Sequence, residues 1–305
     1  MSRNNSRIGL PGAVVVVTGG GRGIGAATAR AFAAAGAKVW IGDVDTDVAA
    51  QTATTIPGCR SARLDVTDRA SWREFLDEVV STDERIDVLV NNAGVMPLGG
   101  FAEEDESTTD LVLDVNVRGV INGMRAVVPG MIDAGRGHIV NIASMAGMIP
   151  LPGMVTYNAS KFAALGVSLA ARREYAGTGV TVTAILPSAV RTELASGAGI
   201  GSTIPTVEPE DVARAVVDSL RKRPARVSVP GWLAPGWSMV TALVPEPIEN
   251  LVRRVIDDRR ALNRIDAEGR RAYIDRIDRQ SRDHSAGEPT SAVPAKPESG
   301  KGRTR

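Results

Sequence analysis

The sequence predicts a doubly wound α/β domain on a mostly parallel seven-stranded sheet, followed by a helical extension. Short β-branched apolar runs alternate with Ala-rich or amphipathic stretches of helical length. The runs are continuously apolar, as in strands that are buried on both faces. Alternation of strand and helix indicates a parallel sheet covered on both sides by right-handed crossovers. With 305 residues and 43% hydrophobic side chains, the chain is large enough to bury such a core.

The expected elements follow this alternation in chain order. The strands, of which the third is the weakest, are Ala13–Val17, Ala37–Ile41, Arg60–Leu64, Ile86–Val90, His138–Ile142, Val180–Ile185 and Arg226–Val229. The helices are Ile24–Ala35, Asp45–Thr54, Asp68–Val80, Asp110–Ile132, Thr156–Tyr175 and Pro209–Lys222. These elements define one domain over residues 12–230, preceded by a polar N-terminus at residues 1–11 that we expect to be flexible.

The C-terminal part of the chain differs in composition. Pro230–Pro247 is rich in proline, and Ile248–Arg279 carries apolar residues at helical spacing among many Arg and Asp residues. We therefore expect an apolar segment and an amphipathic helical extension over residues 231–280. Residues 281–305 have little to bury and are expected to be disordered. Three roles are possible for the extension: it could cover the substrate site, enlarge an oligomer interface or contact a membrane peripherally. We favour an extension that folds back on the protein.

Composition excludes several classes of function. The 36 basic and 35 acidic residues balance, so no overall field attracts the chain to nucleic acid. The single cysteine, Cys59, rules out an internal disulfide or a thiolate cluster, and two histidines leave little for a zinc site. We expect no metal. No apolar run has the length of a signal-peptide core or a transmembrane span, which predicts a cytoplasmic protein.

A glycine-rich loop follows the first strand. Thr18-Gly19-Gly20-Gly21-Arg22-Gly23-Ile24-Gly25 leads directly into an Ala-rich helix. Glycines let the backbone approach a pyrophosphate, and the helix N-terminus offers free N–H groups and a positive dipole. The order of strand, loop and helix predicts a dinucleotide site containing Gly19, Arg22, Gly23, Ile24 and Gly25.

An acidic residue ends the second strand. Asp43 is placed to accept hydrogen bonds from the adenosine ribose hydroxyls. Its carboxylate would repel a 2′-phosphate, which favours NAD over NADP. NADP stays open because Arg22 offers a guanidinium that can pair with a 2′-phosphate. The alternative for the acid is that Asp43 or Asp45 caps the next helix.

One tyrosine of the three has a lysine four residues later. On a helix, the spacing of Tyr157 and Lys161 puts the phenol and the ammonium on one face. A free tyrosine has a pKa of about 10, and a nearby positive charge favours the phenolate. We therefore expect Lys161 to lower the pKa of Tyr157, which would then act as a general acid/base. The alternative is an ordinary exposed helical pair.

Two further polar residues occupy informative positions. Ser144 follows the strand His138–Ile142, at the carboxyl end where ligands of open α/β sheets bind. A turn or helix-cap serine is its alternative role. Asn116 lies within an apolar helical stretch, where a hydrogen-bonded asparagine between helices is the alternative.

Together these residues resemble the short-chain dehydrogenase/reductase family, in its single-domain branch with Tyr-x-x-x-Lys, over residues 12–230. The matching positions are Thr18–Gly25, Asp43, Asp65-Val66, Asn91-Asn92-Ala93-Gly94, Asn116, Ser144, Tyr157 with Lys161, and Pro187 through Thr192. The resemblance implies a Rossmann fold, hydride transfer with a nicotinamide cofactor, and a homodimer or homotetramer. One departure is Ser188, where the family often has glycine after proline, so the loop geometry beside the nicotinamide is open.

The resemblance also implies roles for individual residues. Tyr157 would be the general acid/base, Lys161 would lower its pKa and hold the nicotinamide ribose, and Ser144 would bind the reacting substrate oxygen. Asn116 would hold a water of the proton relay. The resemblance implies that Asp65 and Val66 contact the adenine. Asn92, Ala93 and Gly94 would support the ribose side. Pro187, Val190 and Thr192 would approach the nicotinamide carboxamide.

The loops expected around the site are apolar and hold four of the eight methionines, at positions 96, 145, 148 and 154. Methionine adapts to bulky apolar ligands. With the resemblance, this predicts an NAD(P)-dependent enzyme that interconverts a secondary alcohol and a ketone on a steroid, terpenoid or lipid. The alternatives are an NADPH-dependent 3-oxoacyl reductase of lipid synthesis and a non-catalytic dinucleotide-binding module. The module is disfavoured because Ser144, Tyr157 and Lys161 are all present.

Overall fold

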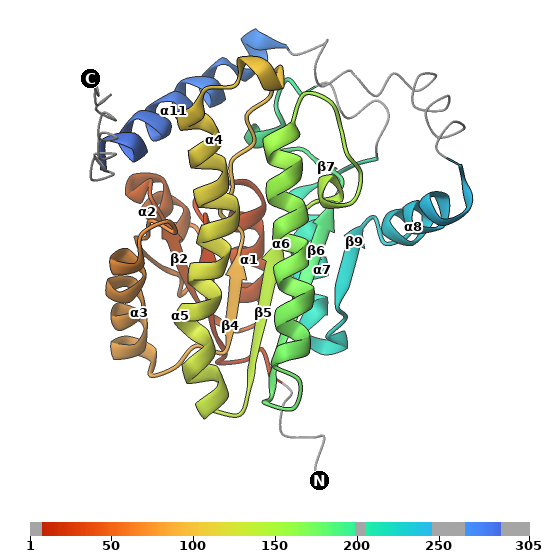
Figure 1. Ribbon diagram of the computed structural model, residues 1–305. Helices are drawn as coiled ribbons and strands as arrows, with labels where there is room; N and C mark the ends of the chain where they lie inside the picture. Colours follow the sequence, from red (N-terminus) through yellow and green to blue (C-terminus); the bar gives the residue numbers. More distant parts are fainter. Residues whose placement is uncertain (1–7, 199–204, 246–265, 288–305) are drawn as a thin grey trace, which may run out of the picture.

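A parallel sheet of seven strands forms the central layer of the protein (Figure 1). The computed structural model describes residues 8–198, 205–245 and 266–287. The expected seven-stranded doubly wound sheet is confirmed, and no strand end differs from its predicted position by more than two residues. In spatial order the strands are β3 (Arg60–Arg63), β2 (Lys38–Asp43), β1 (Val14–Thr18), β4 (Val88–Asn91), β5 (Gly137–Ile142), β6 (Val180–Pro187) and β9 (Arg226–Val229).

Helices cover both faces of the sheet. They are α1 (Gly23–Ala34), α2 (Thr46–Thr54), α3 (Arg69–Asp83), α4 (Glu106–Leu113), α5 (Gly119–Asp133), α6 (Val155–Glu174), α7 (Pro209–Lys222), α8 (Leu233–Leu243) and α11 (Ala267–Gly287). Short elements complete the order, namely η1 (Phe101–Glu103), η2 (Asp114–Arg118), η3 (Met145–Gly147), η4 (Glu193–Ala195), β7 (Ala189–Val190) and β8 (Thr206–Val207). The single helix expected at Asp110–Ile132 is divided into α4 and α5 by η2, which is a π-helical turn.

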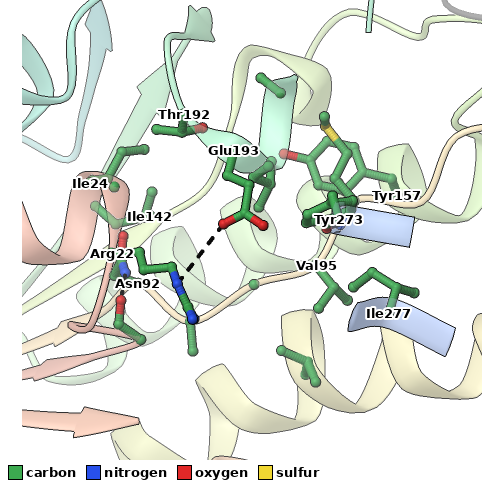
Figure 2. Close-up of a pocket in the computed structure, with 18 of the residues that line it drawn as sticks. Arg22, Ile24, Asn92, Val95, Ile142, Tyr157, Thr192, Glu193, Tyr273 and Ile277 are labelled. Atoms are coloured by element: carbon green, nitrogen blue, oxygen red, sulfur yellow. Dashed lines mark hydrogen bonds and ion pairs between the residues drawn. The ribbon is translucent and has the colours of Figure 1, made fainter. Parts of the chain in front are cut away.

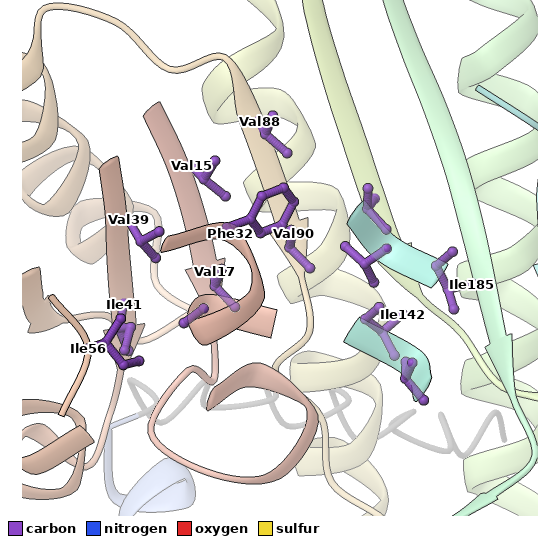
Figure 3. Close-up of a cluster of buried hydrophobic side chains, with 14 of the residues drawn as sticks. Val15, Val17, Phe32, Val39, Ile41, Ile56, Val88, Val90, Ile142 and Ile185 are labelled. Carbon is purple, nitrogen blue, oxygen red and sulfur yellow. The ribbon is translucent and has the colours of Figure 1, made fainter. Parts of the chain in front are cut away.

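The central strands are buried on both faces, which explains their uninterrupted apolar runs. Val15 and Val17 belong to a core cluster with Phe32 of α1, shown in Figure 3. Val14 and Val16 belong to the cluster on the opposite face. Because successive strand residues point to opposite faces, a strand between two helical layers must be apolar at every position. Because all seven strands are parallel, their carboxyl ends lie at one edge of the sheet, and the site is built there.

One buried polar group makes stability depend on pH. His138 of β5 is fully buried; its Nδ1 lies 2.7 Å from Thr181 Oγ1 and its Nε2 lies 3.1 Å from Ser219 Oγ of α7. Burial, with the positive charges of Arg223 and Arg172, lowers the pKa of His138 to about 3. Between pH 6.5 and 3 the unfolded chain therefore binds a proton that the folded protein does not, so stability is lost on acidification.

We expect the free energy of unfolding to fall by about 2 kcal/mol between pH 7 and pH 5 through His138 alone, since each unit of pKa difference is worth about 1.4 kcal/mol. Urea unfolding at both pH values measures this change. The variant His138→Gln should show a flatter pH dependence, whatever its stability at pH 7. Equal pH slopes in the two proteins would contradict the assignment.

The described C-terminal segments correct part of our expectation. Helix α8 lies in the apolar segment that follows residue 230, ahead of the stretch where we expected the amphipathic helix. Helix α11 continues to Gly287, so residues 281–287 are helical rather than disordered, and Ser281 is buried. At the other end, Ile8 and Leu10, which we expected to be flexible, pack against the core. The expectations for residues 1–7, 246–265 and 288–305 lie outside the described residues.

Helix α11 folds back on the domain. It lies beside α4 and across the end of the molecule where the strands terminate (Figure 1). It also contacts η4, in the loop that follows β6 and β7. Within residues 8–198, 205–245 and 266–287, no helix is both long and apolar enough to cross a bilayer. Membrane contact and oligomeric state stay predictions, whereas the described part of the extension takes part in the site.

Candidate active site

A cavity of about 800 Å³ lies at the carboxyl ends of the strands. Of the predicted site residues, Gly25 and Asn116 lie outside its lining. The predicted residues that do line it are Gly19, Arg22, Gly23, Ile24, Asp43, Asp65, Val66, Asn92, Ala93, Gly94, Ser144, Tyr157, Lys161, Pro187, Val190 and Thr192. The fold thus brings segments that are far apart in sequence to one cavity.

The glycine-rich loop has the geometry of a phosphate cradle. Gly19 adopts φ +61°, and a Cβ there would lie 2.8 Å from the Ala93 Cα. A Cβ on Gly25 would lie 2.2 Å from the Gly19 carbonyl oxygen. Arg22 is the N-cap residue of α1 and its side chain does not cap the helix. The loop therefore leaves the backbone N–H groups of the helix N-terminus for an anion, and its residues fit the pyrophosphate of a dinucleotide.

The glycine-rich loop is held in place by the segment that follows β4. Thr18 Oγ1 accepts hydrogen bonds from the backbone N–H groups of Asn92 and Ala93, both at 3.0 Å. The side-chain amide of Asn92 donates to the carbonyl oxygens of Thr18 at 2.9 Å and Gly19 at 3.0 Å. The Asn92 amide group thus fixes the start of the glycine-rich loop through two backbone carbonyls. The sequence indicated Asn92 only through the resemblance, because its bonding partners are more than 70 residues away.

The acidic residues after β2 have separate functions. Asp43 accepts hydrogen bonds from the Gly21 N–H through Oδ2 at 3.0 Å and from the Asp45 N–H through Oδ1 at 3.1 Å. Asp45 caps α2 by accepting from the Val48 N–H, and it pairs with Arg22 at 2.7 Å. The capping alternative is therefore confirmed for Asp45, whereas Asp43 braces the glycine loop beside the cavity. The guanidinium of Arg22 is paired with a carboxylate.

The next predicted cofactor residues follow β3. Asp65 Oδ1 accepts from the Thr67 backbone N–H at 2.9 Å and from its hydroxyl at 2.7 Å. The Val66 carbonyl accepts from the Trp72 indole N–H at 3.1 Å. Both residues line the cavity, as Asp43 does. Their contacts with the adenine stay a prediction.

Helix α6 supplies the phenol and the amine. Tyr157 and Lys161 are both buried, and the Lys161 Nζ lies 5.6 Å from the centroid of the Tyr157 ring. The ammonium donates a hydrogen bond to the Ile142 carbonyl at 3.1 Å. The spacing of four residues puts the two groups on one helix face, as expected, and that face lies against the end of β5. The alternative of an exposed pair is wrong.

Ser144 lies where β5 ends and η3 begins. Its Oγ accepts from the Ala146 N–H at 3.1 Å, so it is the cap of this short helix. It also lines the cavity and makes a side-chain hydrogen bond with Tyr157. The two roles foreseen for Ser144 are compatible, because the cap uses the hydroxyl oxygen as acceptor and leaves the O–H to donate.

Asn116 is a buried bridge between elements. Its Oδ1 accepts from the Val95 N–H at 2.9 Å, and its Nδ2 donates to the Val95 carbonyl at 2.9 Å and to Ser160 Oγ at 3.0 Å. The π-helical turn η2 carries this side chain. The interhelical alternative is therefore confirmed, because Asn116 joins η2 to α6 and to the loop after β4. Its role in a water relay stays a prediction.

Burial dominates the pKa values of the phenol and the amine. Burial raises the pKa of Tyr157 to about 12, the Ser144 hydrogen bond opposes this rise, and Tyr273 adds to it. Burial also lowers the pKa of Lys161 to about 8. The pKa of Tyr157 is therefore raised in this structure, and its lowering by Lys161 stays a prediction for the site with an oxidised nicotinamide bound. Both groups are desolvated, so each charged form is disfavoured on its own.

The loop after β6 accommodates the departure from the family pattern. Ser188, which follows Pro187, donates its backbone N–H to the Val229 carbonyl at 2.9 Å and its hydroxyl to the Pro205 carbonyl at 2.5 Å. Ser188 is not among the residues with positive φ, so the position does not require glycine. Val190 and Thr192 follow it along the cavity, and Thr192 lies against Gly23 of the cradle.

Several cavity residues could not be recognised from the sequence. Glu193 points into the cavity, 3.9 Å from Arg22 Nε and 2.8 Å from Arg276 Nη1 of α11 (Figure 2). Tyr273 and Ile277 of α11 also line the cavity. The helical spacing of apolar residues predicted an amphipathic helix in this region, but periodicity cannot identify the surface on which a helix packs.

Comparison with known proteins gives consistent matches. The family model described as short chain dehydrogenase matches residues 13–200. The chain is 39% identical over 186 residues to the 3-alpha-(or 20-beta)-hydroxysteroid dehydrogenase of Mycobacterium bovis, covering 61% of this chain and 72% of that protein. It is 37% identical over 189 residues to the 2,5-dichloro-2,5-cyclohexadiene-1,4-diol dehydrogenase LinX of Sphingobium indicum, covering 61% and 76%.

A solved structure with the same fold holds a nicotinamide cofactor. The 3-ketoacyl-(acyl-carrier-protein) reductase of Brucella melitensis, complexed with NADH, is 28% identical, with a TM-score of 0.68 over 72% of this chain and 97% of that one. The family match covers more than half of the chain, and the matched segment contains the glycine loop, Ser144, Tyr157 and Lys161. The chain therefore belongs to the short-chain dehydrogenase family and is an oxidoreductase.

Proposed function

We propose that the chain interconverts a secondary alcohol and a ketone on a bulky apolar substrate, with NAD as cofactor. The observation that carries the proposal is the convergence of Ser144, Tyr157 and Lys161 on the cavity that also contains the phosphate cradle. A bound nicotinamide dinucleotide would supply the hydride acceptor or donor, and in its oxidised form a positive charge beside the phenol.

The residues of the chain provide the proton chemistry and the orientation. In alcohol oxidation, the Tyr157 phenolate takes the proton from the substrate hydroxyl while the hydroxyl of Ser144 donates a hydrogen bond to the same oxygen. In ketone reduction, the neutral phenol of Tyr157 donates that proton to the developing alkoxide. Lys161 stabilises the phenolate by its charge, so the two buried groups are each unfavourable alone and favourable as an ion pair.

The substrate end of the cavity is apolar. Met96, Met145, Ile149, Leu151 and Met154 line the cavity, and three of them, Met96, Leu151 and Met154, pack in the cluster that contains Tyr157. These side chains exclude water and adapt in shape, which suits a rigid hydrocarbon better than a small polar acid. The hydroxysteroid dehydrogenase of Mycobacterium bovis, at 39% identity, supports a steroid-like alcohol or ketone as the substrate.

A substrate panel tests the proposal directly. Hydroxysteroids, terpenoid alcohols, fatty alcohols and small 2-hydroxy acids are each incubated with NAD or NADP, and reduced nicotinamide is followed by absorbance. The corresponding ketones are incubated with NADH or NADPH. We expect turnover of bulky apolar substrates with NAD or NADH. A preference for small charged hydroxy acids, or for 3-oxoacyl thioesters with NADPH, would overturn the substrate and cofactor proposed here.

Asp43 is expected to determine the cofactor preference. The variant Asp43→Asn keeps the side-chain shape but removes the charge that repels a 2′-phosphate. We expect the ratio of kcat/KM for NADPH over NADH to rise about tenfold, since a unit charge about 5 Å away is worth roughly 1–3 kcal/mol at effective dielectric constants of 20–80.

The matched control is Asp47→Asn, which removes an exposed acid from the first turn of α2. Asp47 does not line the cavity, so loss of its negative charge should leave the cofactor ratio unchanged. If the two variants change the NADPH-to-NADH ratio of kcat/KM equally, the effect comes from net charge, and Asp43 does not determine the cofactor preference through the ribose.

A further inference from the structure

Helix α11 is fixed to the cavity by a buried arginine. Arg270 is 1% exposed. Its guanidinium donates to the carbonyl oxygens of Leu194 at 2.9 Å and Ser196 at 2.7 Å, and also to that of Met96. These carbonyls belong to two segments, the loop containing η4 and the loop after β4. One side chain thus ties α11 to both walls of the cavity mouth.

Tyr273 lies one turn further along the same helix and is 2% exposed. Its hydroxyl oxygen accepts a hydrogen bond from the Met96 N–H at 2.7 Å. The guanidinium carbons of Arg270 and Arg276 lie 4.5 Å and 5.1 Å from its ring centroid. The ring is held by a hydrogen bond and by two cations, so its position is rigid.

The Tyr273 ring faces the reacting end of the cavity. Tyr157 and Tyr273 both line the cavity, and both are labelled in Figure 2. Met96 connects them, because its side chain packs in the apolar cluster of Tyr157 while its N–H binds the Tyr273 hydroxyl. On its other side, Tyr273 packs in a cluster with Val112 and Ile277. The ring therefore forms part of the wall of the cavity that Tyr157 also lines.

We propose that Tyr273 is a specificity-determining residue that limits the size of the substrate accepted at Tyr157. This inference rests on the proposed function, since it concerns the alcohol or ketone bound there. Tyr157 and Tyr273 line the same cavity, so a substrate held at the Tyr157 hydroxyl shares that space with the Tyr273 ring. A polycyclic alcohol extends further from its reacting carbon than a short acyclic alcohol does, so the ring restricts the polycyclic alcohol more.

The experiment compares Tyr273→Ala, Tyr273→Phe and the wild-type full-length protein. The substrates are a polycyclic secondary alcohol and a short acyclic one, both with saturating NAD. We expect Tyr273→Ala to raise the ratio of kcat/KM, polycyclic over short, by about tenfold or more, the order of discrimination that a change of shape in an apolar pocket produces. Tyr273→Phe keeps the ring and should keep the wild-type ratio.

The matched control is Ile274→Ala, on the exposed side of α11. It truncates the neighbouring residue without touching the cavity and should leave the ratio unchanged. If Tyr273→Ala lowers activity toward both alcohols equally, or leaves the ratio at its wild-type value, the size limit is wrong and Tyr273 only anchors the helix. If the Ala variant does not fold, Tyr273→Leu is used, with the same two outcomes.

A binding measurement separates this inference from the proposed function. The shift in Tm produced by each alcohol, measured with NAD present, reports binding without turnover. If the wild-type protein binds the alcohols but oxidises neither, the proposed function fails. The size limit is then still decided by whether Tyr273→Ala increases the Tm shift of the polycyclic alcohol relative to that of the short one.

Discussion

Replacement of Tyr157 by phenylalanine is expected to lower kcat by about 10²- to 10⁴-fold, the range by which a positioned acid/base accelerates a reaction. The substitution removes only the hydroxyl and leaves the ring packed against Met96 and Met154. The substrate oxygen then keeps its Ser144 donor but has no group to accept or return its proton. The measurement is kcat at saturating cofactor and alcohol, together with the Kd of NAD by fluorescence titration.

The matched control for this variant is Tyr175→Phe, which removes the hydroxyl of the tyrosine at the far end of α6. That residue is outside the cavity lining, so kcat should stay at the wild-type value. The Kd of NAD should change little in either variant, because the cradle is formed by the glycine loop. A Tyr157→Phe protein that retains most of its kcat would show that another group carries the proton.

The fold could be predicted because its determinants are local in sequence. The runs Val14–Val17 and Val39–Ile41 are apolar at every position because both of their faces are buried. The spatial order of the strands, β3-β2-β1-β4-β5-β6-β9, was not predicted, but right-handed crossovers between parallel strands leave few possible strand orders. The division at Asn116 was missed, because a π-helical turn has no periodicity that differs from the helices around it.

The site could be predicted only in part. Spacing along α6 correctly put Tyr157 and Lys161 on one face, and the end of β5 correctly located Ser144. The pKa of Tyr157 could not be predicted, since it depends on how completely α11 and the loop containing η4 close the pocket. Arg270 and Tyr273 were missed for the same reason. Their partners, Met96 and Leu194, are more than 70 residues away in the chain.

The closed pocket gives Lys161 a specific energetic role. Burial raises the pKa of Tyr157 to about 12 and lowers that of Lys161 to about 8, so the phenolate and the ammonium are each disfavoured by the same desolvation. When both charges form, they attract each other, since the ammonium lies 5.6 Å from the centroid of the Tyr157 ring. Two unit charges about 5–6 Å apart attract by roughly 3 kcal/mol at an effective dielectric constant of about 20.

Replacement of Lys161 by methionine is therefore expected to lower kcat for alcohol oxidation by about 10²-fold, since each 1.4 kcal/mol of barrier is a factor of ten. Methionine keeps the apolar stem and removes only the charge. The pH profile of kcat is the informative measurement, because the variant should need a higher pH than the wild type to form the phenolate. Lys222→Met, on the exposed last turn of α7, controls for loss of a lysine charge.

Ketone reduction provides the contrasting result for the same variant. In that direction Tyr157 reacts as a neutral phenol, and burial already keeps it protonated. The charge of Lys161 stabilises only the phenolate that forms late in the step, so kcat for reduction should fall less than kcat for oxidation at neutral pH. If kcat falls equally in both directions and its pH profile is unchanged, the electrostatic pairing of Lys161 with Tyr157 is wrong. Lys161 would then act through its hydrogen bond to the Ile142 carbonyl and by holding the ribose.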